Sequence, residues 1–240
     1  MNQRDRQQSG FTLVEIAIVL VIIGLLLGGV LKGQEMINSA KVKNMVNDFR
    51  TVSSLVYAYQ DRFKALPGDQ TQAQLTQALG APAANAACAP VGANSSCNPN
   101  NGRIDGYWND GAATGTGTLT SEASVFWSHV RLANLATGTT VINDVNYRPR
   151  NADGGFLGVE SGISPAGAAT PMIAGMRGSF FVCSTGILGR YVRQIDIAMD
   201  DGNTSAGSVQ AIPTTAVRGT APTATANIND GTTYTVCAAY

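Results

Sequence analysis

Three residues near the N-terminus have types and spacings that would suit cleavage of the chain and pairing of the charge that the cleavage creates. Gly10 is small and directly precedes Phe11, and Glu15 lies four residues beyond Phe11 inside an apolar run. If the chain were cut between Gly10 and Phe11, the new α-ammonium would stand at the N-terminus of an apolar helix. A Glu15 carboxylate on a neighbouring helix, shifted by about one turn, could pair with that cation and fix the axial register.

The apolar run that surrounds Glu15 extends from Phe11 to Leu31 and has no other charged residue. At about 1.5 Å per residue, a helix over this run is about 30 Å long and can cross a bilayer core. Arg4 and Arg6 precede it and favour a cytoplasmic N-terminus. No small-residue cleavage site of an ordinary signal peptide follows the run. A simple uncleaved anchor would leave Glu15 unexplained, since a carboxylate in such a helix is costly and by default has a partner.

The run Ser9-Gly10-Phe11-Thr12-Leu13-Val14-Glu15 resembles the GFTLxE signature of type IV prepilins and type II secretion pseudopilins. The resemblance implies that a membrane prepilin peptidase cleaves between Gly10 and Phe11 and that Phe11 is N-methylated. It also implies that Glu15 guides assembly with other pilin subunits by an inner-membrane pilus or secretion machinery. One departure is Lys32, where many pilins have a proline that kinks the helix.

Four segments are expected along the chain: a leader at 1–10, a transmembrane or filament-core helix at 11–31, an amphipathic continuation at 32–66, and a head at 67–240. The helix should run from about Phe11 to Lys64, because Pro67 disfavours helix in the residue before it. An apolar stripe with helical spacing suits packing against a sheet. Its residues are Met45, Phe49, Val52, Val56, Tyr59 and Phe63.

The expected fold class is α+β, in which a long N-terminal helix packs on an antiparallel sheet in the head. Helices are predicted over 121–130, with Thr120 as N-cap and Glu122 near the positive end of the helix dipole, and over Leu188 to Met199. Alternating patterns predict strands over 140–147, 178–184 and 232–237. Small-residue stretches predict loops over 111–120, 164–170 and 203–227.

All four cysteines, Cys88, Cys97, Cys183 and Cys237, follow the apolar run in sequence. They form no CxxC pair and the single histidine, His129, is distant from them, which argues against zinc. An even number of cysteines on one side of a membrane anchor indicates disulfides in an oxidising compartment. Of the three possible pairings, 88–97 with 183–237 is preferred, and the second bond would resemble the C-terminal disulfide of many pilins.

Further segments resemble one group of large pilin-like proteins, namely an Asn/Gly-rich loop at 98–108, a helix with a W-x-H pattern at 120–135, and an IDxxxDDG turn at 195–202. The stretch Asn98 to Asp105 partly resembles a calcium loop, but Cys97 and Pro99 occupy its first two ligand positions. The turn from Asp200 to Asn203 is a second calcium candidate, because some pseudopilins bind calcium in their heads; a helix-ending turn also explains it. No cofactor is otherwise expected, and no metal site is assigned.

Composition argues against several classes of function. Lys plus Arg number 16 and Asp plus Glu number 16, so the net charge is zero and no nucleic-acid partner is expected. The sequence has no HExxH, GxSxG or P-loop pattern and no cysteine with a basic neighbour. No catalytic residue is assigned, and the chain is not expected to be an enzyme.

The expected function is that of a structural subunit of a type IV pilus or related filament, a minor or a large major pilin. Two alternatives stay open: a pseudopilin of a type II secretion system, or a tip-located minor pilin that acts as a binding module in adhesion or DNA uptake. Before assembly the chain would cross the inner membrane once, with its N-terminus cytoplasmic and its head periplasmic. It would later lie in an extracellular or periplasmic filament.

Overall fold

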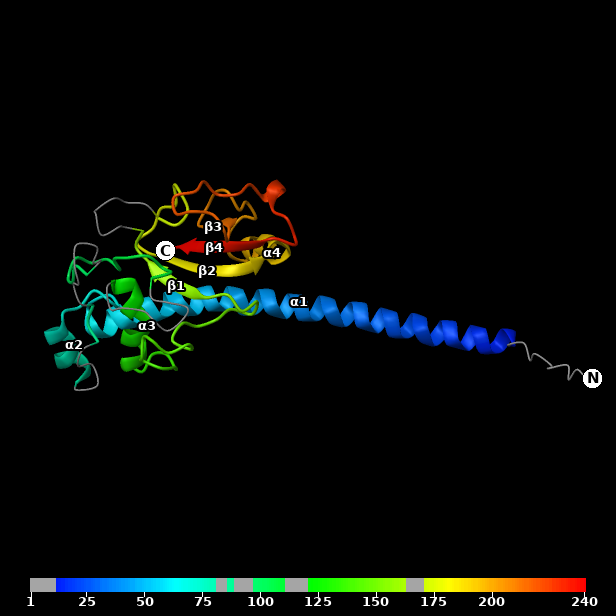
Figure 1. Cartoon of the computed structure of the whole chain (residues 1–240), viewed down its shortest axis with the longest axis horizontal. Coiled ribbons are helices and arrows are strands. Elements are labelled where there is room, and N and C mark those ends of the chain that lie inside the picture. The colour runs from blue at the N-terminus through cyan, green and yellow to red at the C-terminus, as the bar shows by residue number, and fades with distance from the viewer. Residues whose placement is uncertain (1–11, 81–85, 89–96, 111–120, 163–170) are drawn as a thin grey trace, which may run out of the picture. The chain divides into compact units, whose positions relative to one another are not determined.

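The computed structural model describes residues 12–80, 86–88, 97–110, 121–162 and 171–240 (Figure 1). The chain divides into two compact units, residues 1–40 and 41–240, and each is described by itself. One helix, α1 (Leu13–Phe63), contributes to both units. The predicted helix from about Phe11 to Lys64 is therefore confirmed over the described residues.

The end of α1 is set by backbone conformation. Lys64 adopts a left-handed φ of 54°, and its N–H donates to the Gln60 carbonyl at 2.8 Å. A residue in this conformation commonly ends a helix, and Pro67 follows where a helix could not continue. The chain thus leaves the helix at Lys64 and enters the turn that contains Gly68.

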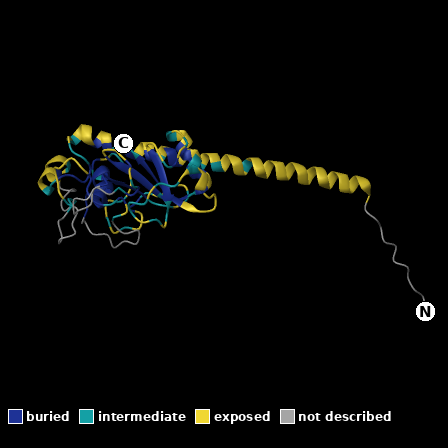
Figure 2. Cartoon of the chain, turned by 90° about the horizontal axis from the view of Figure 1, so that it is seen from above, coloured by how far each residue is buried: buried dark blue, intermediate teal, exposed yellow. Residues whose placement is uncertain are grey.

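The part of α1 in the first unit exposes its apolar side chains (Figure 2). An 18-residue window of α1 reaches a mean hydropathy of 2.8, and none of that window is buried. This helix is long and apolar enough to cross a membrane. Such exposure of a continuous apolar surface indicates a lipid or protein environment around it.

The second unit contains a four-stranded antiparallel sheet in the order β1-β2-β4-β3. Its strands are β1 (Leu157–Glu160), β2 (Phe181–Leu188), β3 (Val209–Pro213) and β4 (Thr233–Ala239). The helices of this unit are α2 (Gln72–Leu79), α3 (Glu122–Leu132), α4 (Gly189–Met199) and a short 3-10 turn, η2 (Thr225–Asn227). The α+β fold with an antiparallel sheet is confirmed.

Both faces of the sheet are covered. Val182 and Val236 belong to the main core cluster, which also contains the buried stripe of α1. The alternate residues Phe181, Cys183 and Cys237 belong to a second cluster on the other side. This alternation follows from the period of two in a β-strand.

The apolar stripe predicted for the second half of α1 is confirmed as core. Five of its six residues, Met45, Phe49, Val52, Val56 and Tyr59, are buried, and Phe63 packs against them partly exposed. The predicted helix over Leu188 to Met199 is also present as α4. The strands expected at 178–184 and 232–237 are present as β2 and β4 with somewhat different ends.

Several local predictions are wrong. Residues 140–147 form turns, not a strand, because the Asp144 carboxylate accepts the Asn146 N–H at 2.7 Å and the Tyr147 N–H donates to the Asp144 carbonyl. Strand β3 lies inside the stretch expected to be a loop at 203–227. The N-cap of α3 is Ser121, whose hydroxyl accepts the Ser124 N–H at 3.1 Å. Thr120 and the loops expected at 111–120 and 164–170 lie outside the described residues.

Helix α2 was not expected from the sequence, although a local signal for it exists. The Thr71 hydroxyl accepts the Gln74 N–H, and the Gln74 side chain accepts the Thr71 N–H at 2.9 Å. This reciprocal arrangement is a capping box, which satisfies two N–H groups that a helix start leaves free. Thr71 and Gln74 are therefore the residues that could have predicted α2.

Candidate functional site

Glu15 lies in the first turn of α1 and closes a capping box with Thr12. Its Oε2 accepts the Thr12 backbone N–H at 2.8 Å and the Thr12 hydroxyl at 2.9 Å. The Thr12 Oγ in turn accepts the Glu15 N–H at 3.2 Å. A carboxylate here also favours the positive end of the helix dipole. The sequence predicts a partner for Glu15 only in another subunit, and the T-x-x-E spacing is the signal for this second role within its own helix.

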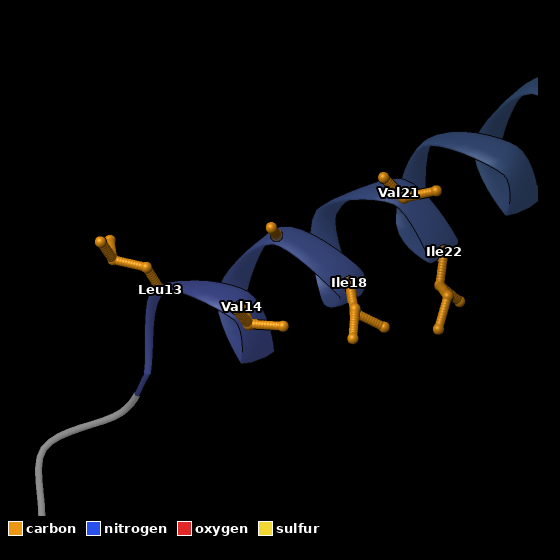
Figure 3. Close-up of a pocket in the computed structure, with 6 residues that line it drawn as sticks. Leu13, Val14, Ile18, Val21 and Ile22 are labelled. Atoms are coloured by element: carbon orange, nitrogen blue, oxygen red, sulfur yellow. The ribbon is translucent and has the colours of Figure 1, made fainter.

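The side chains that follow Glu15 form an apolar surface. Figure 3 shows Leu13, Val14, Ile18, Val21 and Ile22 extending from the helix, and all five side chains are exposed. Leu13 is 91% exposed and Leu25 is 73% exposed. Glu15 is the one ionisable residue between Leu13 and Leu31. Gly10 and Phe11, the expected cleavage and methylation positions, lie outside the described residues.

Comparison with protein families matches residues 5–31 to the prokaryotic N-terminal methylation motif. The chain carries the prepilin signal of type IV pilins and pseudopilins. This signal supports a pilin-like or pseudopilin precursor, and it points to a structural protein rather than to a family of enzymes. Together with the apolar helix it fits a membrane-anchored precursor that is processed by a prepilin peptidase and assembles with other pilin subunits. Searches of curated proteins and of solved structures found no match.

The four cysteines form two disulfides, Cys88–Cys97 and Cys183–Cys237. Cys183 and Cys237 face each other directly in the register of β2 and β4. This is the pairing that the sequence favoured among three. The second bond joins residues 54 positions apart, so it restricts a long segment of the unfolded chain.

The loop expected as a calcium candidate, Asn98 to Asp105, is held by two carboxylates of the second unit. The Asp69 carboxylate accepts the N–H groups of Asn101 and Gly102 at 3.0 and 2.8 Å. The Glu122 carboxylate accepts those of Asn98 and Asp105 at 2.8 and 2.9 Å. The loop thus directs N–H donors at these two carboxylates. Calcium binding at this loop stays a prediction.

Glu122 is fully buried at the start of α3, where the sequence indicated only an interaction with the helix dipole. Burial raises its pKa to about 8, while its two backbone N–H bonds act to lower it. Neighbouring Asp105 and Asp69 raise this pKa further. Its role is to join the loop to α3, and only the tertiary structure reveals it.

His129 has a structural role in the second unit. Its Nδ1 accepts the Gly68 N–H at 2.9 Å, and its Nε2 lies 3.0 Å from the Ala86 carbonyl. The ring is fully buried, and burial lowers its pKa to about 4. A neutral imidazole with one acceptor and one donor nitrogen satisfies both contacts. His129 therefore connects α3 to the turn after α1 and to the segment at Ala86.

The turn expected as a second calcium candidate follows the end of α4. Asp200 is the C-cap of that helix, and the Asp201 Oδ1 accepts the Asn203 N–H at 2.9 Å. The interpretation as a helix-ending turn therefore agrees with the structure. A third carboxylate, that of Asp196, joins Asp200 and Asp201 there. Asp196 is the aspartate of the ID pair in the IDxxxDDG pattern, and it was not among the expected calcium ligands.

Proposed function

We propose that this prepilin is a structural subunit of a type IV pilus or closely related filament. It would be cut between Gly10 and Phe11, N-methylated at Phe11 and polymerised through α1. The observation that carries the proposal is the methylation motif over residues 5–31 on an exposed apolar helix whose first turn holds Glu15. The partners would be prepilin peptidase, other pilin subunits and an inner-membrane assembly machinery.

Assembly would be favoured because it pairs two opposite charges that would otherwise each be isolated among apolar helices. After cleavage, each α1 would begin with an α-ammonium at Phe11 and carry a carboxylate at Glu15. Either charge alone among apolar helices costs several kcal/mol, on the order of 3–5 when a buried partner is lost. A neighbouring subunit shifted by about one helical turn would bring the two together, and the apolar side chains of both helices would pack around the pair.

Glu15 also caps its own helix, so an experiment must separate its charge from its hydrogen bonds. Glu15→Gln keeps a side-chain oxygen that can accept from Thr12 but removes the charge. Thr12→Ala removes the hydroxyl of the cap but keeps the carboxylate. Glu15→Ala removes both features. All three variants retain Gly10, Phe11 and the apolar run, so they should insert into the membrane and be cleaved.

We expect Glu15→Gln and Glu15→Ala to lower filament yield at least about tenfold, since the lost partner costs more than about 1.4 kcal/mol. Thr12→Ala should assemble within about fivefold of the wild type, because a lost cap costs only about 1 kcal/mol. The measurement is the ratio of sheared filament to membrane-held mature subunit, in cells where no other subunit can carry the variant in.

Mass spectrometry of the same samples reads the processing step independently. The mature protein should begin at Phe11 and carry one added methyl group. Assembled filaments that retain Met1 would contradict the processing proposal. Normal filament yield from Glu15→Gln, combined with loss in Thr12→Ala, would show that the cap and not the charge is what assembly needs.

A further inference from the structure

The polar turn between α4 and β3 contains an N-x-S/T pattern, Asn203-Thr204-Ser205. Such a tripeptide, with no proline in its middle position, is the acceptor pattern for N-linked sugars and belongs to surface loops of secreted proteins. The sequence has one other pattern of this kind, at Asn94, which lies outside the described residues. Whether the first pattern can act as an acceptor depends on how the structure presents Asn203.

The backbone of this turn is fixed, while the Asn203 side chain is exposed. The Asn203 N–H donates to the Asp201 Oδ1 at 2.9 Å, and the Asn203 carbonyl accepts the Ala206 N–H at 3.0 Å. Thr204 is buried, and its hydroxyl donates to the Thr223 carbonyl at 2.7 Å. The middle residue of the pattern therefore anchors the turn to the head, and the acceptor residue stays accessible from solvent.

The third residue of the pattern contacts the side-chain amide of the first. The Ser205 hydroxyl donates to the Asn203 Oδ1 at 2.8 Å, and the Ser205 N–H donates to the same oxygen at 3.3 Å. The amide nitrogen of Asn203, Nδ2, has no hydrogen bond among the residues that the structure describes. A new bond at Nδ2 would therefore break no contact there. The bonds to Oδ1 also restrict the amide, which lowers the conformational entropy lost when an enzyme binds it.

A second asparagine has similar turn geometry but lacks the hydroxyl. Asn229 is exposed, and its Oδ1 accepts the N–H of Gly231, again the residue two positions further on, at 2.9 Å. Because position 231 is glycine, the N-x-S/T pattern is incomplete. Asn229 is therefore a matched internal control for Asn203.

We propose that Asn203 is the acceptor of an N-linked oligosaccharide whose donor is carried on a lipid pyrophosphate in the membrane. A carboxamide nitrogen is a weak nucleophile, since its lone pair is delocalised into the carbonyl, so the sugar needs a good leaving group. Pyrophosphate is such a group, and the lipid would keep the donor in the membrane that anchors the precursor. The inference rests on the proposed function, because it needs a head that has crossed that membrane.

The transfer exchanges one bond for another. The Asn203 Nδ2 forms a bond to the anomeric carbon of the first sugar, and the bond from that carbon to the pyrophosphate oxygen breaks. The electron pair of the broken bond leaves with the lipid pyrophosphate, and Nδ2 loses one proton to a base of the membrane oligosaccharyltransferase that catalyses the step. Nothing is oxidised or reduced. The product retains Oδ1, so both hydrogen bonds from Ser205 can persist, and the bulky glycan extends into solvent.

Tryptic peptides separate the relevant asparagines. Residues 194–218 form one peptide whose only asparagine is Asn203, and the pattern at Asn94 falls in a different peptide. Asn229 falls in the peptide 219–240. The mature protein would be isolated from the cells that produce it naturally, and mass spectrometry would use fragmentation that keeps sugars on their side chains. We expect the added mass of an oligosaccharide on Asn203 and no sugar on Asn229.

Four single variants test the assignment in the same cells. Asn203→Gln removes the acceptor, and Ser205→Ala removes the hydroxyl but keeps the amide. Both should lose the added mass completely. Ser205→Thr restores a hydroxyl and Asn229→Gln alters only the control, so both should keep the added mass. None of these side chains is buried, so all four variants should fold and form both disulfides.

Three results would overturn the proposal. The first is an unmodified peptide 194–218 from mature protein that begins at Phe11 and contains both disulfides. The second is a sugar on a hydroxyl group of that peptide instead of on Asn203. The third is unchanged modification in Ser205→Ala, which would show that the hydroxyl is not needed. A chain that keeps Met1 and has free thiols would overturn the proposed function together with this inference, whereas the first three results leave the proposed function in place.

Discussion

The carboxylate of Glu15 has one partner inside the subunit, Thr12, and the proposed assembly would give it a second one in the filament. Within the subunit, both hydrogen bonds from Thr12 end on Oε2. A cation from a neighbouring subunit could therefore approach the same carboxylate from the side of Oε1 and leave the cap in place. The cap also orients the carboxylate before assembly, which lowers the conformational entropy lost when the charges pair.

His129 makes the stability of the head depend on pH. Its pKa is about 4 in the folded chain and about 6.5 when unfolded, because burial disfavours the imidazolium. Between these values the unfolded chain binds more protons, so stability rises with pH and is lost as pH falls from 6.5 to 4. The shift corresponds to about 3 kcal/mol at most.

We expect His129→Gln to remove this contribution, since glutamine has a donor and an acceptor but does not titrate. The measurement is the free energy of unfolding by denaturant at pH 4, 5.5 and 7 for both proteins in detergent. The difference in the free energy of unfolding between wild type and variant should change by up to about 3 kcal/mol from pH 7 to pH 4. The wild type should lose more stability at low pH than the variant. If wild type and variant differ by the same free energy of unfolding at pH 4, 5.5 and 7, then His129 does not cause the pH dependence of stability.

Among the elements, the turn between α1 and α2 depends on one glycine. Gly68 has a φ of 103°, and an added Cβ would lie 2.6 Å from the Glu122 carbonyl oxygen. Its N–H is also the donor to His129 Nδ1 at 2.9 Å. Gly68 therefore contacts both the start of α3 and the buried His129, and at this position only a hydrogen atom fits on Cα.

We expect Gly68→Ala to destabilise the head by about 2–4 kcal/mol, combining the cost of a left-handed backbone with that of the clash. Gly102→Ala is the control, since Gly102 has a φ of 75° but no atom within 4 Å of an added Cβ. Gly102→Ala should lower the stability of the head by only about 1 kcal/mol, because it has the cost of the left-handed backbone without the clash. Thermal unfolding of the two variants side by side measures the difference. Equal losses would mean that the close approach to α3 relaxes without cost.

For the whole molecule, the boundary between the two units falls inside α1. The compact unit 41–240 includes the second half of this helix, and seven of its apolar side chains are buried there. These residues are Val42, Met45, Val46, Phe49, Val52, Val56 and Tyr59. At about 1.5–3 kcal/mol for each buried side chain, the seven together contribute about 10–20 kcal/mol, which is as large as or larger than the usual stability of a domain, about 5–15 kcal/mol.

We expect a fragment of residues 41–240, produced in an oxidising compartment, to fold as a soluble protein with both disulfides formed. A fragment of residues 67–240 should not fold, because it lacks the stripe of α1 that fills the main core. Dispersion of amide resonances in NMR spectra and cooperative thermal unfolding distinguish the two cases. Cooperative unfolding of the 67–240 fragment would show that the sheet and α3 form a core without α1.

The sequence by itself determined the features that depend on neighbouring residues. The motif around Gly10, Phe11 and Glu15, the length of α1 and the stripe from Met45 to Phe63 all follow from order, apolar content and helical spacing. The antiparallel α+β class and α4 followed from the same local signals. The preferred cysteine pairing needed the resemblance to pilins as well.

Tertiary structure decided what depends on segments that are distant in sequence. It placed Glu122 in the interior, where the loop at 98–105 covers it, and it buried His129 between Gly68 and Ala86. It also brought one oxygen from each of the Asp196, Asp200 and Asp201 carboxylates within 4.8 Å of the others. Spacing along a chain specifies which side of a helix or strand a residue occupies. Whether that side meets water, an N–H group or another charge depends on which remote segment packs there.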